Sequence, residues 1–286
     1  MLGALALAFS LIVAQAETIG VSRVSRPLRP GEVVLLTIEA RTGPVTVRAF
    51  DRDWPVYAVD PGRWRALIGI DLETKAGRHL VAIAAGSART SYPLDIGRRV
   101  FPTRRLTVDP ALVNPPADAA ARIERETREL EAVWKASADE PLWRGPFVRP
   151  VPDPANSAFG TRSILNGEPR SPHNGTDFLS PAGRPVEAPN AGRVVIADSR
   201  YFSGNTVVID HGLGLFSLLA HLSEIAVRKG DVVHPGDVVG KVGATGRVTG
   251  PHLHWTVRAN GARVDPLSLL FVTADAVRGP VKLPPE

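Results

Sequence analysis

The stretch GPHLHWTVRANGARV, from Gly250 to Val264, decides how the second half of the chain folds. Asn-Gly at 260–261 joins two runs of β-forming residues, and this dipeptide is a strong signal for a two-residue β-hairpin. A strand therefore runs through HLHW. Because side chains alternate along a strand, His252 and His254 would point to the same face. Two imidazoles on one wall predict a packing pair, a metal site, or an acid–base group beside a metal.

Short β-forming runs separated by glycine and proline fill most of the chain. Before residue 107, the runs VVLLTIEA, VTVRAF, RALIGIDL, HLVAIAAG and TSYPLDI recur at roughly regular spacing, which is typical of a β-sandwich. After Pro150, GRVVIAD, NTVVID and LFSLLAH resume the pattern, and we expect no long helix there. The predicted fold class is mainly β, with an N-terminal β-sandwich-like domain and a C-terminal antiparallel β domain.

A charged segment with helical rather than β-forming periodicity connects the two β regions. The segment ADAAARIERETRELEAVWKAS carries Ile123, Leu130, Val133 and Trp134 near helical spacing among charges. It predicts a short amphipathic linker helix docked on a neighbour. The expected organisation is a signal peptide at 1–16, a β-sandwich-like domain at 17–106, a helical linker at 107–145, the second β domain at 146–273 and a tail at 274–286.

The first sixteen residues, MLGALALAFSLIVAQA, resemble an export signal. They are apolar and end in Ala14-Gln15-Ala16, a small-x-small site that a signal peptidase could cut. The run is shorter than the roughly 20 residues of a membrane helix, so we expect no stable membrane span after cleavage. The segment lacks a basic residue, and the alternatives are an uncleaved anchor or a misassigned start. The predicted localisation is the periplasm or cell envelope.

The amino-acid composition limits which metal ligands and which binding partners are possible. The chain has 286 residues, no cysteine and a formal net charge of +5. Without thiolates, a metal site must use histidine and carboxylate ligands. The positive charge fits an anionic polymer or membrane surface as a partner, but also simple solubility. The sequence contains no nucleic-acid-binding motif, so we expect no nucleic-acid partner.

All histidines except His79 follow Pro150, and four of them stand with one aspartate in three short motifs. SPHNGTDF carries His173 and Asp177, LLAHLS carries His221, and HLHW carries the pair described above. Glycine and proline around His173 favour a loop that runs into a strand. A catalytic zinc ion takes three protein ligands and keeps a fourth position for water. Two further histidines could transfer protons, and spacing alone leaves open which three groups bind metal.

From about Phe159 to Leu269 the chain resembles the M23 family of zinc metallopeptidases, the lysostaphin/LytM-type peptidoglycan endopeptidases. The resemblance rests on six ordered elements: FGTR at 159–162, PRSPHNGTDF at 169–178, GNTVVIDHG at 204–212, LLAHLS at 218–223, GDVVHPGDVVGKVGATGRVTGPHLHW at 230–255 and VDPLSLL at 264–270. It implies an M23-type antiparallel β domain, one Zn²⁺ per chain, and hydrolysis of peptide bonds in peptidoglycan stem peptides or cross-links during cell-wall remodelling.

The resemblance also implies roles for individual residues. It assigns His173, Asp177 and His254 as the metal ligands. It makes His252 the catalytic general base and His221 a second catalytic histidine that orients water or stabilises the oxyanion.

Four further polar residues stand near these motifs. Arg162 and Asn205 are candidates for substrate contact, with loop anchoring as the alternative. His211 is expected to be a turn residue or a support for the metal ligands, and His234 a turn residue.

Two rival functions remain. M23-like domains that have lost metal ligands can act as non-catalytic regulators that bind and activate a cell-wall amidase. A barrel-sandwich carrier domain of the biotinyl or lipoyl kind is suggested by the GDVV…GDVVG quasi-repeat, but it would leave the histidines unexplained. The presence of all five His and Asp positions favours the hydrolase over both.

Overall fold

The structure is a computed structural model, and it describes residues 18–41, 43–107, 115–157 and 159–278. The predicted signal peptide at 1–16 lies outside the described residues, as do residues 108–114 of the linker and 279–286 of the tail. Strands far outnumber helices among the described residues and pair almost entirely antiparallel, which confirms the mainly β fold class. No helix among the described residues is both long and apolar enough to cross a membrane.

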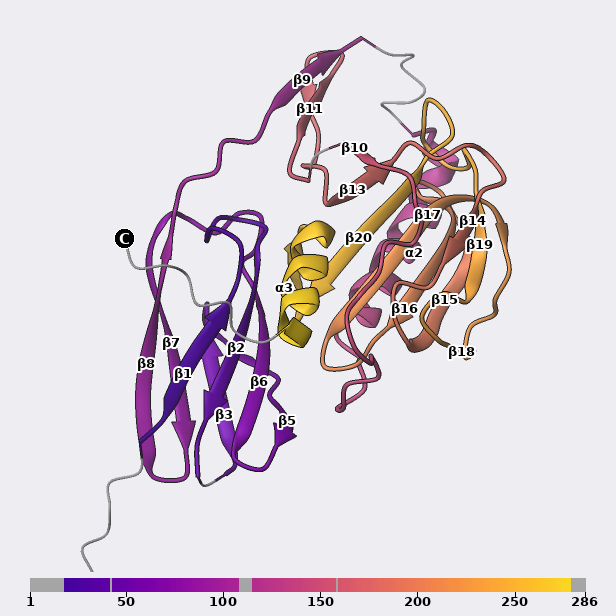
Figure 1. The fold of residues 1–286 in the computed structure, drawn as a ribbon. Coiled ribbons are helices and arrows are strands. Elements are labelled where there is room, and N and C mark those ends of the chain that lie inside the picture. Colours follow the sequence, from indigo (N-terminus) through magenta and orange to yellow (C-terminus); the bar gives the residue numbers. More distant parts are fainter. Residues whose placement is uncertain (1–17, 42, 108–114, 158, 279–286) are drawn as a thin grey trace, which may run out of the picture.

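Two four-stranded sheets form the N-terminal β-sandwich (Figure 1). In sheet order, the first consists of β1 (Gly20–Val24), β2 (Val33–Glu39), β6 (Arg63–Gly69) and β5 (Tyr57–Asp60), and the second of β4 (Arg52–Trp54), β3 (Val45–Ala49), β7 (Gly77–Ala85) and β8 (Ala88–Ile96). Strand β3, VTVRA, alternates buried and exposed side chains, as expected when one face meets the core and the other meets water.

Strand β2 behaves differently because both of its faces are covered. Its first four residues, VVLL, are all buried. One face packs inside the sandwich, and the other meets helix α3 (Pro266–Arg278) of the C-terminal region, which lies between the sandwich and strand β20 (Figure 1). The continuous apolar run in β2 is therefore the sequence signature of an interface with the rest of the chain.

A ten-stranded antiparallel sheet forms the C-terminal region. Its main path runs β10 (Ala155–Ser157), β13 (Gly175–Phe178), β20 (Leu253–Ala259), β17 (Leu215–Ile225), β16 (Gly204–Asp210), β15 (Gly192–Arg200) and β18 (Val232–Val233), and it is joined by β14 (Pro185–Glu187), β19 (Val238–Val242) and β21 (Ala262–Val264). The path places β13, β20 and β17, which carry Asp177, His254 and His221, side by side.

The hairpin predicted at 260–261 is present. Val257 pairs with Val264 and Ala259 with Ala262, which leaves two residues in the turn. Asn260 and Gly261 have φ of 46° and 82°, the left-handed backbone that a type I′ turn requires and that this dipeptide tolerates best. The hairpin fixes the register of β20 and thereby the face on which His254 lies.

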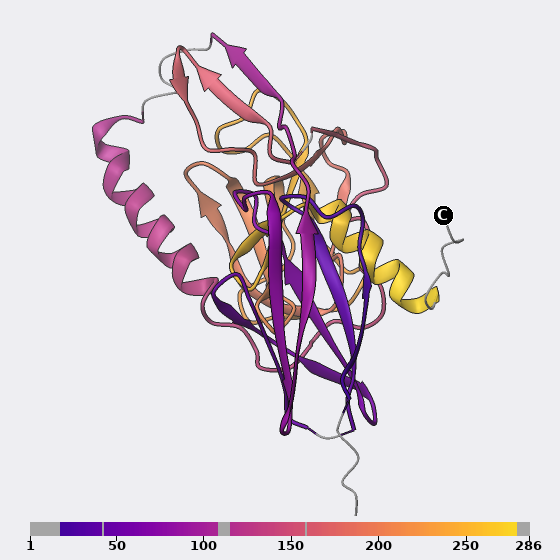
Figure 2. The same cartoon turned by 90° about the vertical axis from the view of Figure 1, so that its left-hand side faces the viewer.

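Helix α2 (Ala120–Val133), preceded by the short helix η1 (Ala117–Ala119), lies where the linker was predicted. Leu130, Val133 and Trp134 pack on a cluster of buried side chains from β15, β16 and β17, and the Trp134 ring meets Phe216 edge-on at 5.2 Å. Figure 2 shows α2 and α3 on opposite sides of the molecule. The amphipathic pattern of the linker therefore reflects docking on the outer face of the large sheet.

Helix α3 contradicts our expectation that no long helix follows Pro150. It spans Pro266–Arg278, and two ordinary start signals precede it. The Asp265 carboxylate accepts a hydrogen bond from the Leu267 N–H (3.0 Å), as an N-cap does. Pro266 stands at the first helical position, where a missing N–H costs nothing. The Asp265-Pro266 pair is a sequence signal for a helix start. We missed it because the surrounding sequence is rich in glycine and short β-forming runs.

The sandwich and the large sheet share a continuous hydrophobic core, and buried polar groups reinforce the contact. Glu32 and Asp265, each 5% exposed, both pair with Arg26 (2.6 and 2.7 Å). Ser268 of α3 donates to Glu32 Oε2 (2.7 Å) and accepts from the Val33 N–H (2.8 Å). These bonds join β2 to α3 across the interface.

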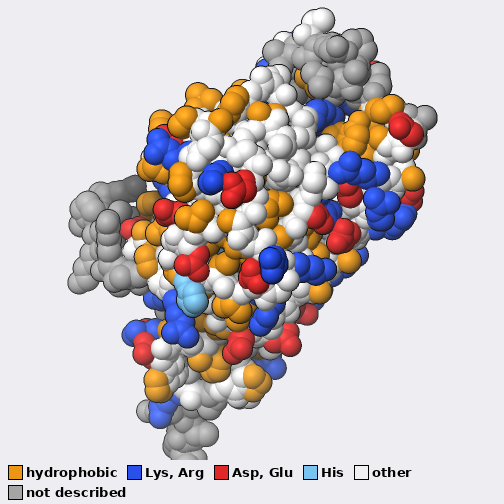
Figure 3. Space-filling view, turned by 90° about the vertical axis from the view of Figure 1, so that its right-hand side faces the viewer, with side chains coloured by type: hydrophobic (Ala, Val, Ile, Leu, Met, Phe, Trp, Pro, Cys, Tyr) orange, Lys and Arg blue, Asp and Glu red, His pale blue; other side chains and the backbone are white. Residues whose placement is uncertain are grey.

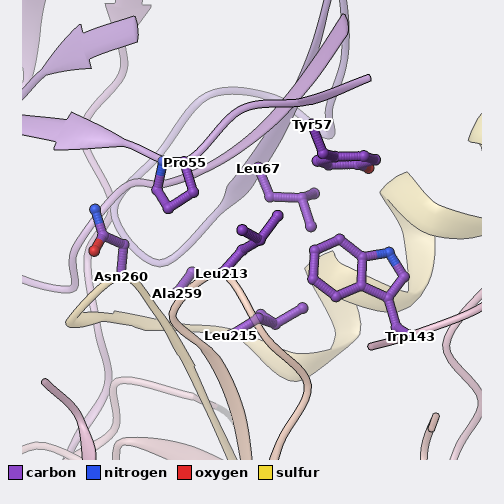
Figure 4. A pocket seen from close by; sticks show the side chains of 8 residues that line it. All are labelled: Pro55, Tyr57, Leu67, Trp143, Leu213, Leu215, Ala259 and Asn260. Atoms are coloured by element: carbon purple, nitrogen blue, oxygen red, sulfur yellow. The ribbon is translucent and has the colours of Figure 1, made fainter. Parts of the chain in front are cut away.

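The same interface leaves only a small gap. Pro55, Tyr57 and Leu67 of the sandwich meet the large sheet, Trp143 and Leu213 around a cavity with about 10 Å³ available to water centres (Figure 4). This is about the space that one water molecule needs. The cavity is a packing defect of the interface and is too small to bind a substrate.

The segment that leaves the sandwich also enters the second β region. Strand β9 (Thr103–Leu106) pairs in parallel with β11 (Arg162–Leu165), and β11 pairs with β12 (Glu168–Pro169). Figure 1 shows this small sheet extending beyond both larger units. Residues 103–106, assigned from sequence to the N-terminal domain, thus form the edge strand of a sheet whose other two strands lie just before His173. The predicted domain boundaries stay a prediction.

Candidate metal and active site

Two adjacent strands and one loop bring His173, Asp177 and His254 together. Asp177 in β13 is the register partner of His254 in β20, so the two side chains lie on the same face. His173 lies in the loop before β13, as predicted. Its backbone is fixed by hydrogen bonds at both ends: its N–H donates to the Thr161 carbonyl (2.9 Å), and its carbonyl accepts from the Gly160 N–H (2.7 Å).

The three side chains converge on one point. Asp177 Oδ1 lies 2.7 Å from His254 Nδ1 and 2.9 Å from His173 Nε2, and the two nitrogens are 3.1 Å apart. Ligand atoms about 2.0–2.1 Å from a tetrahedral zinc ion are about 3.3 Å apart, so a small opening of this cluster would admit the ion. One carboxylate and two imidazoles are also a donor set that zinc prefers. The residues present therefore fit a zinc site.

Protonation in the cluster suits metal binding. Burial alone would raise the pKa of Asp177, but hydrogen bonds with His173 and His254 outweigh it and hold the pKa of this carboxyl far below its ordinary value. Burial lowers the pKa of His254, and the opposing influence of Asp177 does not restore it. At neutral pH the site therefore offers a carboxylate and an unprotonated imidazole, the forms that coordinate a cation.

A second layer of contacts orients His254. Its Nε2 lies 2.8 Å from Thr256 Oγ1, and this hydroxyl donates in turn to Asn174 Oδ1 (3.3 Å). When a metal replaces the contact between Nδ1 and Asp177, Thr256 Oγ1 can accept the Nε2–H of His254 and leave the Nδ1 lone pair for the metal.

His221 and His252 stand beside this cluster. Their ring centroids are 4.9 Å apart, and the His221 centroid is 5.9 Å from that of His254. His252 Nε2 lies 3.9 Å from Asp177 Oδ1. The structure thus brings all five sequence-predicted residues into one site.

Both flanking histidines are anchored to the backbone in the same way. His221 Nδ1 bonds to the Thr245 carbonyl (2.9 Å), and His252 Nδ1 bonds to the Gly250 carbonyl (2.9 Å). A carbonyl oxygen only accepts, so Nδ1 carries the proton in each ring and Nε2 is the basic atom. Burial, the neighbouring His254 and His252 lower the pKa of His221 to about 4 despite the contact with Thr245. His221 is therefore neutral at pH 7.

An irregular backbone places the His221 side chain. The register of β17 shifts against β16 and against β19 near this residue, and His221 has φ of 65°. This left-handed conformation is uncommon for a residue with a side chain. Bulges of this kind redirect a side chain out of the regular alternation of a strand and are frequent beside active sites.

The four other polar residues considered from the sequence differ in burial and in their contacts with the site. Asn205 is half-buried: its N–H donates to Thr245 Oγ1 (2.9 Å) and its amide nitrogen to the Ser223 carbonyl (3.4 Å), so it supports the loop that holds His221. Arg162 is exposed on β11. His234 is exposed in a turn, as expected. His211 is fully buried and bonds to the Ala191 carbonyl and Ser217, away from the cluster.

Sequence reasoning did not single out Thr256 or Asn174, and it used Gly175 only as a sign of a loop. The first two were visible only as neighbours of His254 and His173, and their hydrogen bonds depend on the β13–β20 pairing. Gly175 had a readable signal, since it stands between two candidate ligands. A Cβ at Gly175 would lie 2.4 Å from the Trp255 carbonyl oxygen and 2.8 Å from His254 Cε1, so only glycine fits.

A mainly β fold with a His-Asp-His cluster and two flanking histidines defines a metallopeptidase-like site. The profile of peptidase family M23 matches residues 171–266. A crystal structure described as that of an M23 peptidase from Pseudomonas aeruginosa is 34% identical, covers 86% of this chain and 96% of its own, and superposes with a TM-score of 0.69. The chain belongs to the M23 peptidase family.

Curated relatives match a smaller region. The peptidoglycan DD-endopeptidase ShyA of Vibrio cholerae is 43% identical over 107 residues, which are 37% of this chain and 25% of ShyA. The DD-carboxypeptidase/endopeptidase Mpg of Neisseria meningitidis serogroup B is 42% identical over 103 residues, or 36% of this chain and 24% of Mpg. The chain spans about a quarter of the length of these relatives.

Proposed function

We propose that the protein is a zinc-dependent endopeptidase that hydrolyses peptide bonds in peptidoglycan. One observation carries the proposal: three ligand atoms within 4.8 Å of one another lie beside two histidines whose Nδ1 atoms are anchored on backbone carbonyls. A purely structural cluster would not need two additional basic nitrogens. The names of ShyA and Mpg supply the substrate class.

The protonation states of the site residues suit them to two roles, metal binding and proton transfer. When bound by His173, Asp177 and His254, zinc would supply a Lewis acid that activates water and polarises the peptide carbonyl. His252 Nε2 faces the cluster and would take a proton from the attacking water and return it to the leaving amine.

The geometry narrows the role of His221. Its neutral Nε2 can only accept a hydrogen bond, because the ring proton is donated to Thr245. Donation to an oxyanion would require a second proton, and the lowered pKa of this residue opposes that. We therefore assign His221 to holding the water in place.

The non-catalytic regulator is the second candidate. Regulators of this type are expected to lack ligands, whereas the described part of this chain holds a complete cluster with its supporting contacts. The peptidase is therefore the better-supported reading.

Localisation and organisation follow as proposals. The resemblance of residues 1–16 to an export signal and the proposed cell-wall substrate support export to the periplasm or cell envelope. The N-terminal sandwich would act as a docked support: it shares a core with the large sheet, and β9 pairs with the strand that precedes the metal-site loop.

On the face shown in Figure 3, basic and acidic side chains are interspersed, so on that face the net positive charge does not form a single basic surface for an anionic polymer.

Digestion of purified cross-linked peptidoglycan tests the proposal. The protein is stripped of metal, zinc is restored to half of the sample, and the soluble products are separated and weighed by mass spectrometry. We expect cleavage only with zinc, and the product masses identify the bond. A protein that binds zinc stoichiometrically yet releases nothing would contradict the enzymatic assignment. A protein that binds no zinc would favour the regulator.

A further inference from the structure

Of the three candidate metal ligands, His173 alone lies outside the strands of the large sheet. Asp177 and His254 are paired residues of β13 and β20, whereas His173 stands in the loop before β13. The His173 N–H donates to the Thr161 carbonyl, and its own carbonyl accepts from the Gly160 N–H. The large sheet therefore places two ligands, and a short backbone segment beside the loop holds the third.

The aromatic ring of Phe101 lies directly on that segment. Phe101 belongs to the stretch that leaves the sandwich after β8 and leads to β9. A Cβ at Gly160 would overlap Cδ1, Cε1 and Cζ of the Phe101 ring, so the ring rests against bare backbone. Two residues further on, the Arg162 N–H donates to the Pro102 carbonyl (2.9 Å), where the pairing of β9 with β11 begins. The segment thus contacts both the exit from the sandwich and the backbone of His173.

The sandwich in turn fixes the Phe101 ring. The Arg99 guanidinium lies 5.0 Å from the centre of the Phe101 ring and 5.8 Å from that of Phe159, and the two rings meet edge-on at 6.3 Å. Arg99 also donates to the Pro30 carbonyl (3.0 Å) in the turn before β2. Phe159 is 2% exposed and lies against Gly31 of the same turn, where a Cβ would meet Phe159 Cδ1 at 2.9 Å. Contacts with this turn therefore set where Phe101 lies.

We propose that Phe101 is a positioning residue for the metal ligand His173. Its ring holds Gly160 in place, and the segment that contains Gly160 holds the His173 backbone. Without this contact the loop would have to become ordered when the ion binds, and the lost conformational entropy would weaken binding. Contacts behind the ligands of a metal site commonly have this effect. The sandwich thereby contributes to the zinc site through a residue that is not itself a ligand.

This inference rests on the zinc site of the proposed function and gives the sandwich a defined part in it. The test is the zinc affinity of the metal-free full chain, measured by competition with a chromophoric chelator, so it does not depend on turnover. We expect Phe101→Ala to raise the Kd for zinc by about tenfold, the lower end of the range for contacts that orient a ligand.

Two further variants accompany this measurement. Phe101→Leu keeps part of the apolar bulk over Gly160 and should restore part of the affinity; it also provides the test if the alanine variant does not fold. Phe271→Ala is the matched control, because Phe271 is a phenylalanine of α3 whose side chain is 40% exposed. Its Kd for zinc should equal that of the wild type.

Amide hydrogen exchange separates positioning from a general loss of stability. In the metal-free protein, Phe101→Ala should speed exchange at Gly160 and His173, whose N–H groups join the segment to the loop. Ser268→Ala weakens the contact between the sandwich and α3 at a different point. It should lower the free energy of unfolding but leave exchange at these two amides and the zinc affinity unchanged.

The outcomes distinguish this inference from the proposed function. A folded Phe101→Ala protein with the zinc affinity of the wild type would overturn the inference and leave the peptidase assignment intact. Weaker zinc binding with unchanged exchange at Gly160 and His173 would also overturn it, because the effect would not pass through this segment. The expected zinc and exchange results in a protein that cleaves no peptidoglycan would support the positioning role while contradicting the peptidase assignment. A wild type that binds no zinc would overturn both.

Discussion

The imidazole of His254 lies against Gly175 on the neighbouring strand, so closely that a Cβ at position 175 would meet His254 Cε1 at 2.8 Å and Nε2 at 2.9 Å. Strand pairing alone would bring the backbones of β13 and β20 together. The missing side chain leaves room for the ring beside β13, with Nδ1 toward Asp177. A glycine without chemistry of its own is therefore part of the metal site.

Gly175→Ala should weaken zinc binding by about 10- to 100-fold, the range seen when contacts that orient a ligand are lost. The methyl group must push the His254 ring away from the cluster. The measurement is competition with a chromophoric chelator. Gly97→Ala is the control, since a Cβ there meets its nearest neighbour, the Leu28 carbonyl oxygen, at 3.5 Å, an ordinary contact. Unchanged zinc affinity in Gly175→Ala, with the fold retained, would show that the ring does not need this space.

His252→Ala should retain zinc and lose turnover by about 10²- to 10⁴-fold, because the metal ligands remain while the proton acceptor is removed. Zinc content by mass spectrometry and kcat on a cleavable peptide provide the two readouts. His234→Ala, in an exposed turn, is the control. If His252→Ala lost the metal as well, His252 would be part of the coordination and the division of roles between the two histidines would be wrong.

Ser268→Ala should lower the free energy of unfolding by about 1–3 kcal/mol, the cost of leaving a buried donor unsatisfied. The hydroxyl serves both the Val33 N–H and Glu32 across the interface between the sandwich and α3. Denaturant unfolding measures the change, and zinc affinity should stay as in the wild type. A variant as stable as the wild type would mean that this interface contributes little beyond its apolar contacts.

Local signals predicted the parts of the fold and site that depend on neighbouring residues. The Asn260-Gly261 turn and the alternation through HLHW located β20 with His254, and His252 directly before it, without further information. The run VVLL in β2 was read only as a strand, because nothing in the sequence says what covers its second face. That answer requires α3, which lies more than 200 residues away along the chain.

The irregular parts of the site were beyond sequence reasoning for a different reason. The left-handed backbone at His221 arises from register shifts against two partner strands, and strand register is a property of the pairing.

His211 predicts how stability depends on pH. Burial lowers its pKa to about 4 from the ordinary 6.5, although the Ala191 carbonyl acts in the opposite direction. Between these two values the unfolded chain binds a proton that the folded protein does not, so acid favours unfolding. The contribution of neutral His211 is complete above pH 6.5 and is lost as the pH falls toward 4, by about 3 kcal/mol in total at 1.36 kcal/mol per pKa unit.

Urea unfolding of the wild type and His211→Asn from pH 7 to pH 4 isolates this effect. Asparagine keeps a donor for the Ala191 carbonyl but does not titrate, so the variant should be less stable at pH 7 and should lose less stability on acidification. The other histidines, His221 among them, are common to both proteins, and their contributions cancel in the difference. A constant difference between the two proteins across this pH range would show that His211 becomes protonated in the folded state as readily as in the unfolded chain.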